Sequence, residues 1–543
     1  MATNPTIVSM GALPGGVGRH RRPRDAVVIG AGPNGLVAAN LLVDAGWDVL
    51  VLEAQPTVGG AVRHDSGVAG GFVHDEFSAF YPLSLAGPTI PALGLENYGL
   101  RWVHAPAVLG NPQQDGSWAM LHRRPEDTIA GLDELSPGDG AAWRELYEAW
   151  QIIGPSVVRS LLTPFPPVRG ALSTLARLPK VGGFDYVRFL LEPASVMGGA
   201  RFRTEHGQLL IAGNALHADI AMDSAGSGLL GLMLAMSGQA VGFPVPEGGS
   251  GRLTQAMADR LVARGGLIQC DTRVDKVLVD RRRVQGVVTA AGERIEARAV
   301  VADVSAPALY GDLVGYDELP DRVRRGMARF EFDPATIKVD WALSGPVPWA
   351  STPPSAPGTV HIIDSMDQLS RAQAAITSHS IPAEPFLLVG QMTTADPTRS
   401  PAGTEALWAY THVPQEARRD DGPDGLTGRW DRDECERFAD RMQARIEKYA
   451  PDLASRIIAR RVLGPYELQA RNENLVRGAL GGGTANLQQQ LIFRPVTGTG
   501  RADTAVRGLF LGSASAHPGG GVHGAPGSNA ARAVLAAART GRL

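Results

Sequence analysis

The sequence predicts an α/β protein in which both ends of the chain build one domain and a second domain is inserted between them. Two patterns predict the first domain: a strand–glycine loop–helix–strand pattern over residues 25–53, and a strand–glycine loop–helix pattern over residues 506–539. The third observation is length, because 543 residues exceed the size at which a single hydrophobic core stops growing. We therefore expect a Rossmann-type domain with an inserted α+β substrate domain.

The first pattern is a complete dinucleotide fingerprint. Residues 26–29 and 49–52 are apolar runs typical of buried parallel strands, and residues 36–43 between them are typical of a helix. The first strand ends at Gly30, Gly32 and Gly35. In this fingerprint the glycines make a tight turn, allow backbone N–H groups to approach a pyrophosphate, and allow close packing of helix against sheet. The helix N-terminus then faces the phosphates.

Glu53 follows the second strand, where an acid accepts hydrogen bonds from an adenosine ribose. A carboxylate at this position repels a 2′-phosphate, so FAD or NAD fits better than NADP. A glycine triplet alone is weak support in a chain with 66 glycines, and a nucleotide-free α/β turn is the alternative. The full order of strand, turn, helix, strand and acid is much more specific.

The choice of a flavin depends on two further glycine segments. Gly59 and Gly60 allow the chain to pass close to a ligand, and Arg63 is placed to meet a phosphate or a flavin edge, although an ordinary glycine turn is equally compatible. At the other end, an apolar strand leads into the glycine-rich residues 517–529 and an alanine-rich helix that ends at Arg539. The N-terminus of such a helix stabilises negative charge on a reduced flavin.

These segments resemble flavoproteins of the phytoene-dehydrogenase-related family, a branch of the glutathione-reductase-like FAD fold often labelled pyridine nucleotide-disulphide oxidoreductase domain-containing. The resemblance thins between about residues 101 and 240 and specifies no substrate. It implies FAD as the cofactor, with Val274 against the adenine and Ala302 and Asp303 closing the same pocket. The matching segments are residues 27–36, 49–53, 59–60, 243–253, 274–302 and 512–527. The cofactor-binding residues that we expect are Gly30, Gly32, Pro33, Asn34, Gly35, Glu53, Ala54, Gly59, Gly60, Arg63, Val274, Gly512, Ser513, Gly520, Gly521 and Val522.

The expected domain order alternates along the chain. A flexible tail (residues 1–24), which a presequence would also explain, precedes FAD-binding segments 25–100, 243–310 and 501–543, and substrate-domain segments 101–242 and 311–500 lie between them. Strands and turns are expected to dominate residues 307–404. The other expected elements are a strand pair within 100–122, helices at 139–150, 229–241, 253–263 and 431–449, and strands at 267–270, 273–280, 284–290, 294–302, 337–343, 386–392, 407–412 and 462–468.

No catalytic residue can be named from a motif. The chain has no Ser/His/Asp order at elbow spacing and no Cys/His cluster with metal spacing, so we expect no metal. A flavin that takes a hydride needs chiefly correct placement and charge stabilisation. His517, His523 and Tyr81 are weak candidates, and a structural role is an equal alternative for each. With only one full fingerprint we expect no separate NAD domain, and therefore an electron acceptor such as oxygen or a quinone.

We therefore expect an FAD-dependent oxidoreductase that desaturates or otherwise dehydrogenates a largely apolar organic substrate by hydride transfer to the flavin. A redox-neutral or reducing flavoenzyme, such as a polyene isomerase or saturase, and a flavin amine oxidase are alternatives. A flavin-binding interaction or regulatory protein with little turnover is an alternative from another class. The sequence names neither the substrate nor the oligomeric state.

Composition and charge limit the partners and the compartment. A net charge of −3 gives no sign of nucleic-acid binding. Cys270 and Cys435 are the only cysteines, which fits a reducing compartment, and no apolar run is long enough to span a bilayer, so a cytoplasmic protein is expected. Residues 149–184 lack acids and carry three arginines and a lysine among apolar runs. A peripheral membrane contact that admits an apolar substrate, or a lid, would explain this segment.

Overall fold

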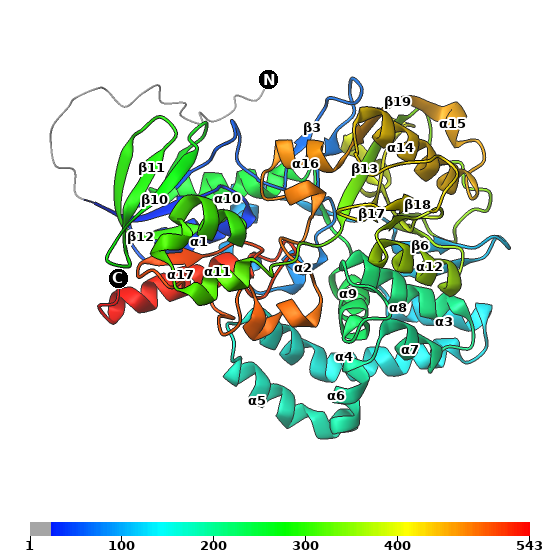
Figure 1. The fold of residues 1–543 in the computed structure, drawn as a ribbon. Coiled ribbons are helices and arrows are strands. Elements are labelled where there is room, and N and C mark those ends of the chain that lie inside the picture. Colours follow the sequence, from blue (N-terminus) through cyan, green and yellow to red (C-terminus); the bar gives the residue numbers. More distant parts are fainter. Residues whose placement is uncertain (1–22) are drawn as a thin grey trace.

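The computed structural model describes residues 23–543. The tail predicted for residues 1–24 lies outside the described residues except for its last two, and Arg24 already begins the first strand. Two lobes, each built around a large β-sheet, lie side by side (Figure 1).

The first sheet is assembled from strands that are far apart in the sequence. Its parallel part has the order β9–β2–β1–β12–β20, and an antiparallel hairpin, β10–β11, extends it along the first residues of β12. The strands of the parallel core are buried on both faces, which explains their continuous apolar runs. The strands are β1 (Arg24–Ile29), β2 (Val49–Leu52), β9 (Leu267–Gln269), β10 (Val274–Asp280), β11 (Arg283–Thr289), β12 (Arg294–Ala302) and β20 (Leu509–Leu511).

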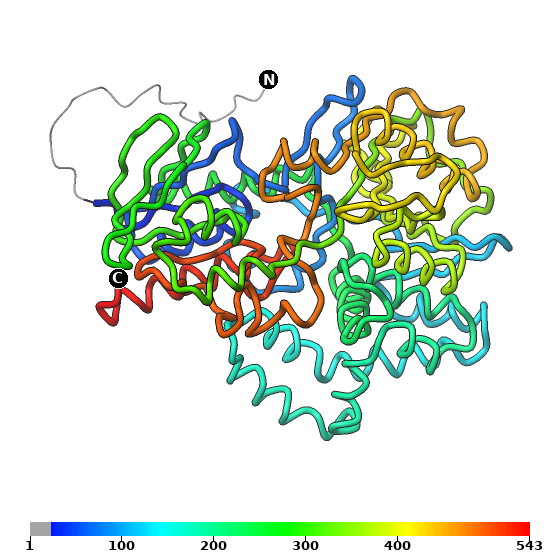
Figure 2. Tube along the Cα trace, viewed as in Figure 1, coloured from blue at the N-terminus to red at the C-terminus, as the bar shows by residue number. Residues whose placement is uncertain are grey.

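Three helices cover this sheet: α1 (Pro33–Asp44), α10 (Gly251–Ala263) and α17 (Ala525–Arg539). Helix α1 contacts both α10 and α17. Gly527 allows the close approach of α17, because a Cβ there would overlap the carbonyl oxygen of Asn34. Figure 2 shows the consequence: the blue start of the described chain and its red end lie side by side in one lobe. The expected α/β class with a Rossmann-type domain is confirmed.

The second sheet has the order β19–β13–β17–β16–β14–β6–β7 and is antiparallel except between β14 and β6. One face packs on α14 (Arg432–Glu447), where Phe438 and Met442 meet Val339 and Leu407. The other face packs on a group of helices that includes α4, α8 and α9. The strands are β6 (Ala107–Pro112), β7 (Trp118–Leu121), β13 (Ala335–Leu343), β14 (Pro357–Ile362), β16 (Leu387–Gln391), β17 (Glu405–Val413) and β19 (Ile457–Leu463).

The remaining helices and short strands lie mainly around the second sheet and between the lobes (Figure 1). The helices are α2 (Pro82–Ala86), α3 (Pro125–Leu135), α4 (Asp139–Leu162), α5 (Val168–Arg177), α6 (Phe184–Leu191), α7 (Ala194–Gly199), α8 (Glu205–His217), α9 (Ser227–Val241), α11 (Asp321–Met327), α12 (Met366–Thr377), α13 (Met392–Ala395), α15 (Leu453–Arg456) and α16 (Pro465–Arg471). The short strands are β3 (His64–Asp65), β4 (His74–Asp75), β5 (Trp102–Val103), β8 (Val245–Pro246), β15 (Ser380–Ile381) and β18 (Arg419–Asp420).

Two expected elements differ from the structure. The strand expected at residues 462–468 is wrong in its second half, because β19 ends at Leu463 and Pro465 begins α16. Proline has no N–H to donate to a ladder but fits the first turn of a helix, so the change of element falls at this residue. The strand-dominated interpretation of residues 307–404 missed α11 and α12, whose apolar positions are sparse.

Candidate cofactor and substrate site

The glycine loop after β1 has no room for side chains at its key positions. A Cβ at Gly32 would lie 2.6 Å from Asp303 Oδ2, and a Cβ at Gly35 would overlap the Gly30 carbonyl oxygen. The loop is held by two hydrogen bonds: Gly30 N–H donates to the Leu52 carbonyl at 2.8 Å, and Gly35 N–H donates to Asp303 Oδ2 at 2.8 Å. Glycine is therefore required here by the packing of α1 against the sheet.

Glu53 lies against this loop at the end of β2. Its Oε2 accepts from Ala31 N–H at 2.7 Å, and its Oε1 accepts from Gln55 N–H at 2.9 Å. Each carboxylate oxygen keeps acceptor capacity after one such bond, so the buried side chain is suited to hold ribose hydroxyls. Asp303 lies near the same loop, where burial raises its pKa to about 7.

Two buried polar atoms test whether this site fits a bound group. Within residues 23–543, Asn34 Oδ1 and Arg63 Nε have no hydrogen-bond partner. Buried polar atoms are normally paired, so both positions fit a group that supplies the missing partners. The other end of the Arg63 guanidinium is already engaged, because Nη2 donates to the Arg471 carbonyl at 2.9 Å and lies 3.4 Å from Glu76 Oε2.

The remaining predicted cofactor residues follow the edge of the same site. Gly59 N–H donates to the Ala31 carbonyl, and a Cβ at Gly60 would lie 3.0 Å from Gly32 Cα. Gly512 N–H donates to the Ala302 carbonyl, which places Gly512 and the buried Ser513 directly after β20. Pro33 begins α1, Val274 is buried at the start of β10, and Ala54 is exposed. The cofactor role of each residue stays a prediction.

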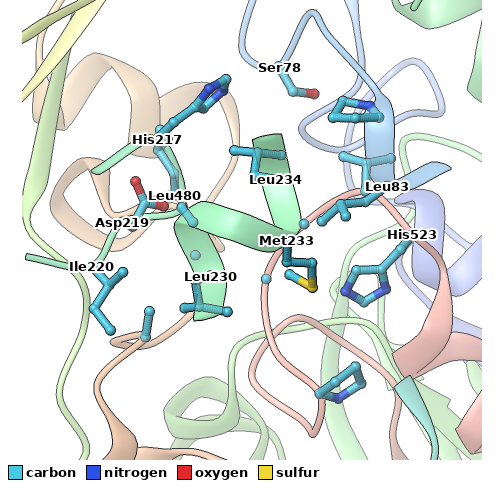
Figure 3. Close-up of a pocket in the computed structure, with 18 of the residues that line it drawn as sticks. Ser78, Leu83, His217, Asp219, Ile220, Leu230, Met233, Leu234, Leu480 and His523 are labelled. Atoms are coloured by element: carbon cyan, nitrogen blue, oxygen red, sulfur yellow. The ribbon is translucent and has the colours of Figure 1, made fainter. Parts of the chain in front are cut away.

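A cavity of about 490 Å³ adjoins the C-terminal glycine loop and extends between the lobes. Gly520, Gly521 and Val522 line one end, close to the N-terminus of α17. Its middle is apolar: Leu230, Met233 and Leu234 of α9 lie between His523 on one side and His217 on the other (Figure 3). A ligand in this cavity would be surrounded chiefly by aliphatic and aromatic side chains.

The three weak catalytic candidates all line this cavity, and each also has a structural contact. Tyr81 O–H donates to the Ser78 carbonyl at 2.8 Å, and burial raises its pKa. His523 Nδ1 accepts from Ala525 N–H at 3.1 Å, and burial lowers the His523 pKa to about 4. His517 Nε2 lies 2.8 Å from the Thr163 carbonyl oxygen and is therefore the protonated nitrogen. None of them has a free, strong base at its contact atom.

Lys338 lines the cavity and was missed by the sequence analysis. It lies on β13, is buried, and forms an ion pair with Asp340. Arg461 pairs with Asp340 at 2.8 Å and with Asp65 at 2.6 Å, so alternating charges lead away from the cavity. The available signal was a lysine, one of only four in the chain, within an otherwise largely apolar nine-residue strand.

Burial lowers the pKa of Lys338, although Asp340 opposes this effect. Burial alone would raise the pKa of Asp340, but the nearby cations, Lys338 first among them, lower it overall. The Lys338 amine therefore gives up a proton more readily than an ordinary lysine. It provides the cavity wall with a group able to hold or release a proton.

Comparisons with known proteins agree on a flavin enzyme fold. Residues 28–83 match a family described as NAD(P)-binding Rossmann-like domain, and residues 193–535 match one described as flavin containing amine oxidoreductase. Pyridine nucleotide-disulfide oxidoreductase domain-containing protein 2 of Mus musculus is 29% identical, covering 96% of this chain and 95% of its own. A limonene dehydrogenase from Castellaniella defragrans is 23% identical (94% and 94%), and phytoene desaturase (lycopene-forming) of Pseudescherichia vulneris is 24% identical (94% and 99%).

Two solved structures share the fold. An oxidoreductase from Methanosarcina mazei aligns with a TM-score of 0.58 at 16% identity, covering 94% of this chain and 99% of its own. A variant of putrescine oxidase aligns with a TM-score of 0.57 at 15% identity, covering 95% and 99%.

Membrane-spanning helices and metal clusters are both absent from the described residues. Across residues 23–543 no helix combines the length and the apolar character needed to cross a membrane. The same part of the chain has no group of three or more His, Cys, Asp or Glu side chains placed to hold a metal ion.

Proposed function

The chain belongs to the flavin-containing amine oxidoreductase family and is an FAD-dependent oxidoreductase, and we propose that it dehydrogenates a largely apolar organic substrate. The expected FAD cofactor and the resemblance to phytoene-dehydrogenase-related flavoproteins are confirmed. The observation that carries the proposal is the apolar cavity of about 490 Å³ beside the C-terminal glycine loop. Relatives named as limonene dehydrogenase and phytoene desaturase support it.

The residues of the chain divide the work of this reaction. The aliphatic wall formed by α9 binds and orients the substrate, with burial contributing about 25 cal/mol per Å² of apolar surface. The same wall excludes water from the reacting carbon. A bound FAD supplies the hydride acceptor, and its adenosine half is held by the Gly30–Gly35 loop and Glu53. Lys338 Nζ takes or returns the proton that accompanies hydride transfer.

The proposed electron acceptor is oxygen, a quinone or another diffusible molecule. The support is that the sequence contains one full dinucleotide fingerprint, at residues 25–53, and that its adenosine-binding acid serves the FAD. Reduced FAD would then be reoxidised without a bound nicotinamide.

We also propose that the protein works in the cytoplasm at the surface of anionic membranes, through residues 149–184. This segment exposes Val168 (59%), Leu172 (61%) and Phe184 (78%) beside its arginines. Val158 and Leu161 of α4, from the same segment, line the cavity, so the exposed surface and the cavity are continuous along one element. Apolar side chains flanked by cations suit an anionic lipid surface.

Vesicle flotation tests the membrane contact. Binding to vesicles with anionic lipids should fall as salt rises, and Leu172→Asp should abolish it. Val262→Asp, at an equally exposed apolar position on α10, is the matched control and should bind as wild type does. A protein that never floats, or a control that fails equally, would contradict the contact.

An anaerobic titration of the flavin spectrum tests the dehydrogenation. Apolar terpenoid or polyene compounds should bleach the oxidised flavin, and small polar amines should not. Bleaching by amines alone would favour the second candidate, a flavin amine oxidase, which the family match and the putrescine oxidase fold support. Turnover only with pre-reduced flavin would indicate a reducing or redox-neutral enzyme, and a flavin that no compound affects would indicate an interaction protein.

A further inference from the structure

One end of the cavity carries polar side chains, although most of its wall is apolar. His217, the last residue of α8, and Asp219 lie on the side opposite His523, with the leucines of α9 between them (Figure 3). Tyr410 of β17 lines the cavity as well, and its ring lies 5.7 Å from that of His412, the residue two positions further along the strand. We call His217, Asp219, Tyr410 and His412 the polar end.

The charges at the polar end are already balanced. His412 Nε2 lies 2.7 Å from Asp219 Oδ1. Burial alone would lower the pKa of His412, but Asp219 outweighs burial and raises it, so the two residues form an imidazolium–carboxylate pair. The neighbouring Lys338, opposite Tyr410 in the sheet, is paired with Asp340. A further full charge brought by a ligand would find no unpaired opposite charge here.

Hydrogen-bonding groups at the polar end nevertheless remain free. Asp219 Oδ2 and the Tyr410 hydroxyl make no hydrogen bond to another residue of the described chain, and His217 Nδ1 is buried there without a partner. Burial raises the pKa of Tyr410, so its hydroxyl keeps its proton and donates. A carboxylate oxygen that accepts and a phenol that donates, both bordering an apolar cavity, complement a group that can do both at once.

We propose that the polar end binds a hydroxyl group of the substrate, so that the substrate is an apolar alcohol anchored away from the flavin end of the cavity. The alcohol donates to Asp219 Oδ2 and accepts from the Tyr410 hydroxyl, while its hydrocarbon part fills the space beside α9. This inference rests on the proposed dehydrogenation and narrows its substrate class. A pure hydrocarbon would leave both groups unpaired, which costs affinity.

The backbone at Asp219 supports a functional role. Its φ of 57° lies in the left-handed region, which side chains other than Asn and Asp seldom adopt. Such conformations concentrate at ligand-binding positions. Asn tolerates the same backbone, so Asp219→Asn removes the charge without forcing the chain to move.

Binding of matched probes to the FAD-loaded enzyme tests the proposal. The probes are farnesol, farnesene as the hydrocarbon without the hydroxyl, and farnesylamine as the cation, with affinity read from the perturbed spectrum of the oxidised flavin. Farnesol should bind roughly tenfold more tightly than farnesene, the effect of one to two hydrogen bonds. Tyr410→Phe and Asp219→Asn should each reduce this preference severalfold while leaving farnesene affinity unchanged.

Tyr186→Phe is the matched control. Tyr186 is also buried with a hydroxyl that has no partner within the described chain, but it does not line the cavity. This variant should keep the full preference for the alcohol. Equal affinities for farnesol and farnesene in the wild-type enzyme, tighter binding of farnesylamine than farnesol, or an unchanged preference in Tyr410→Phe would each overturn the proposal.

The two proposals fail separately. If hydrocarbons and alcohols bleach the flavin equally well, dehydrogenation of apolar substrates stands and the hydroxyl anchor is wrong. If farnesol binds with the expected preference but no apolar compound ever bleaches the flavin, the anchor stands and the dehydrogenation is wrong.

Discussion

The cofactor half of the site is built from backbone, whereas the substrate half is built from side chains. Around Gly30, Gly35 and Glu53, function depends on where a Cβ is absent and where N–H groups point. Around the cavity, it depends on Lys338 and Tyr410, which meet only because β13 and β17 pair. The difference teaches that the first half fails when the backbone is crowded, and the second fails when single groups are removed. The following changes test that contrast.

Adding one methyl group to the glycine loop should have the largest effect. In Gly35→Ala the new Cβ overlaps the Gly30 carbonyl, a backbone atom that cannot rotate away. We expect purified protein with almost no FAD, measured from the flavin absorbance per chain. Gly131→Ala adds the same methyl group in α3, where no atom lies within 4 Å. This control should keep full FAD content, and a Gly35→Ala protein saturated with FAD would refute the crowding argument.

The buried Asp303 should make stability depend on pH. Its pKa is raised from 3.8 to about 7, so between these values the folded chain holds a proton that the unfolded chain has released. The free energy of unfolding of FAD-free protein should therefore fall as pH rises from about 4 to 7, by up to about 4 kcal/mol. Asp303→Asn keeps an acceptor for Gly35 N–H and should remove this slope in denaturant titrations. A slope that persists in the variant would assign the titration to another group.

Removing the cavity lysine should slow the reaction and spare the cofactor. Lys338→Met deletes the proton-holding amine, and general acid–base groups contribute about 100-fold or more to rate. The anaerobic rate of flavin reduction by substrate should fall by about that factor, with a changed pH profile. Lys276→Met, at an exposed position on β10, is the control and should reduce at the wild-type rate. Equal rates in both variants would remove Lys338 from the reaction.

Glu53→Gln should have the smallest effect of the four. The amide keeps a hydrogen-bonding group but loses the charge, so FAD affinity should weaken by about 1–3 kcal/mol. Glu293→Gln, exposed at the turn before β12, should bind FAD as wild type does. Equilibrium titration of FAD-free protein measures both. Unchanged affinity in Glu53→Gln would mean that the acid does not hold the ribose.

The same contrast explains how much the sequence could predict. The Rossmann-type fold and the positions of Gly30–Gly35 and Glu53 follow from spacing within one short segment, because neighbours in sequence there are neighbours in space. Lys338, Tyr410 and Asp219 are brought together by strand pairing and by the end of α8, and no local pattern encodes that meeting. The candidate histidines illustrate the limit: His517 and His523 do reach the cavity, but only the structure shows their contacts with Thr163 and Ala525.

The most direct test of the account measures FAD affinity and the anaerobic reduction rate on the same two proteins, Glu53→Gln and Lys338→Met. The account predicts opposite profiles. Glu53→Gln binds FAD more weakly but, once saturated with FAD, is reduced at the wild-type rate. Lys338→Met holds FAD at wild-type affinity and is reduced about 100 times more slowly. If affinity and rate instead change together in both proteins, the two halves of the site do not have the separate roles assigned to them.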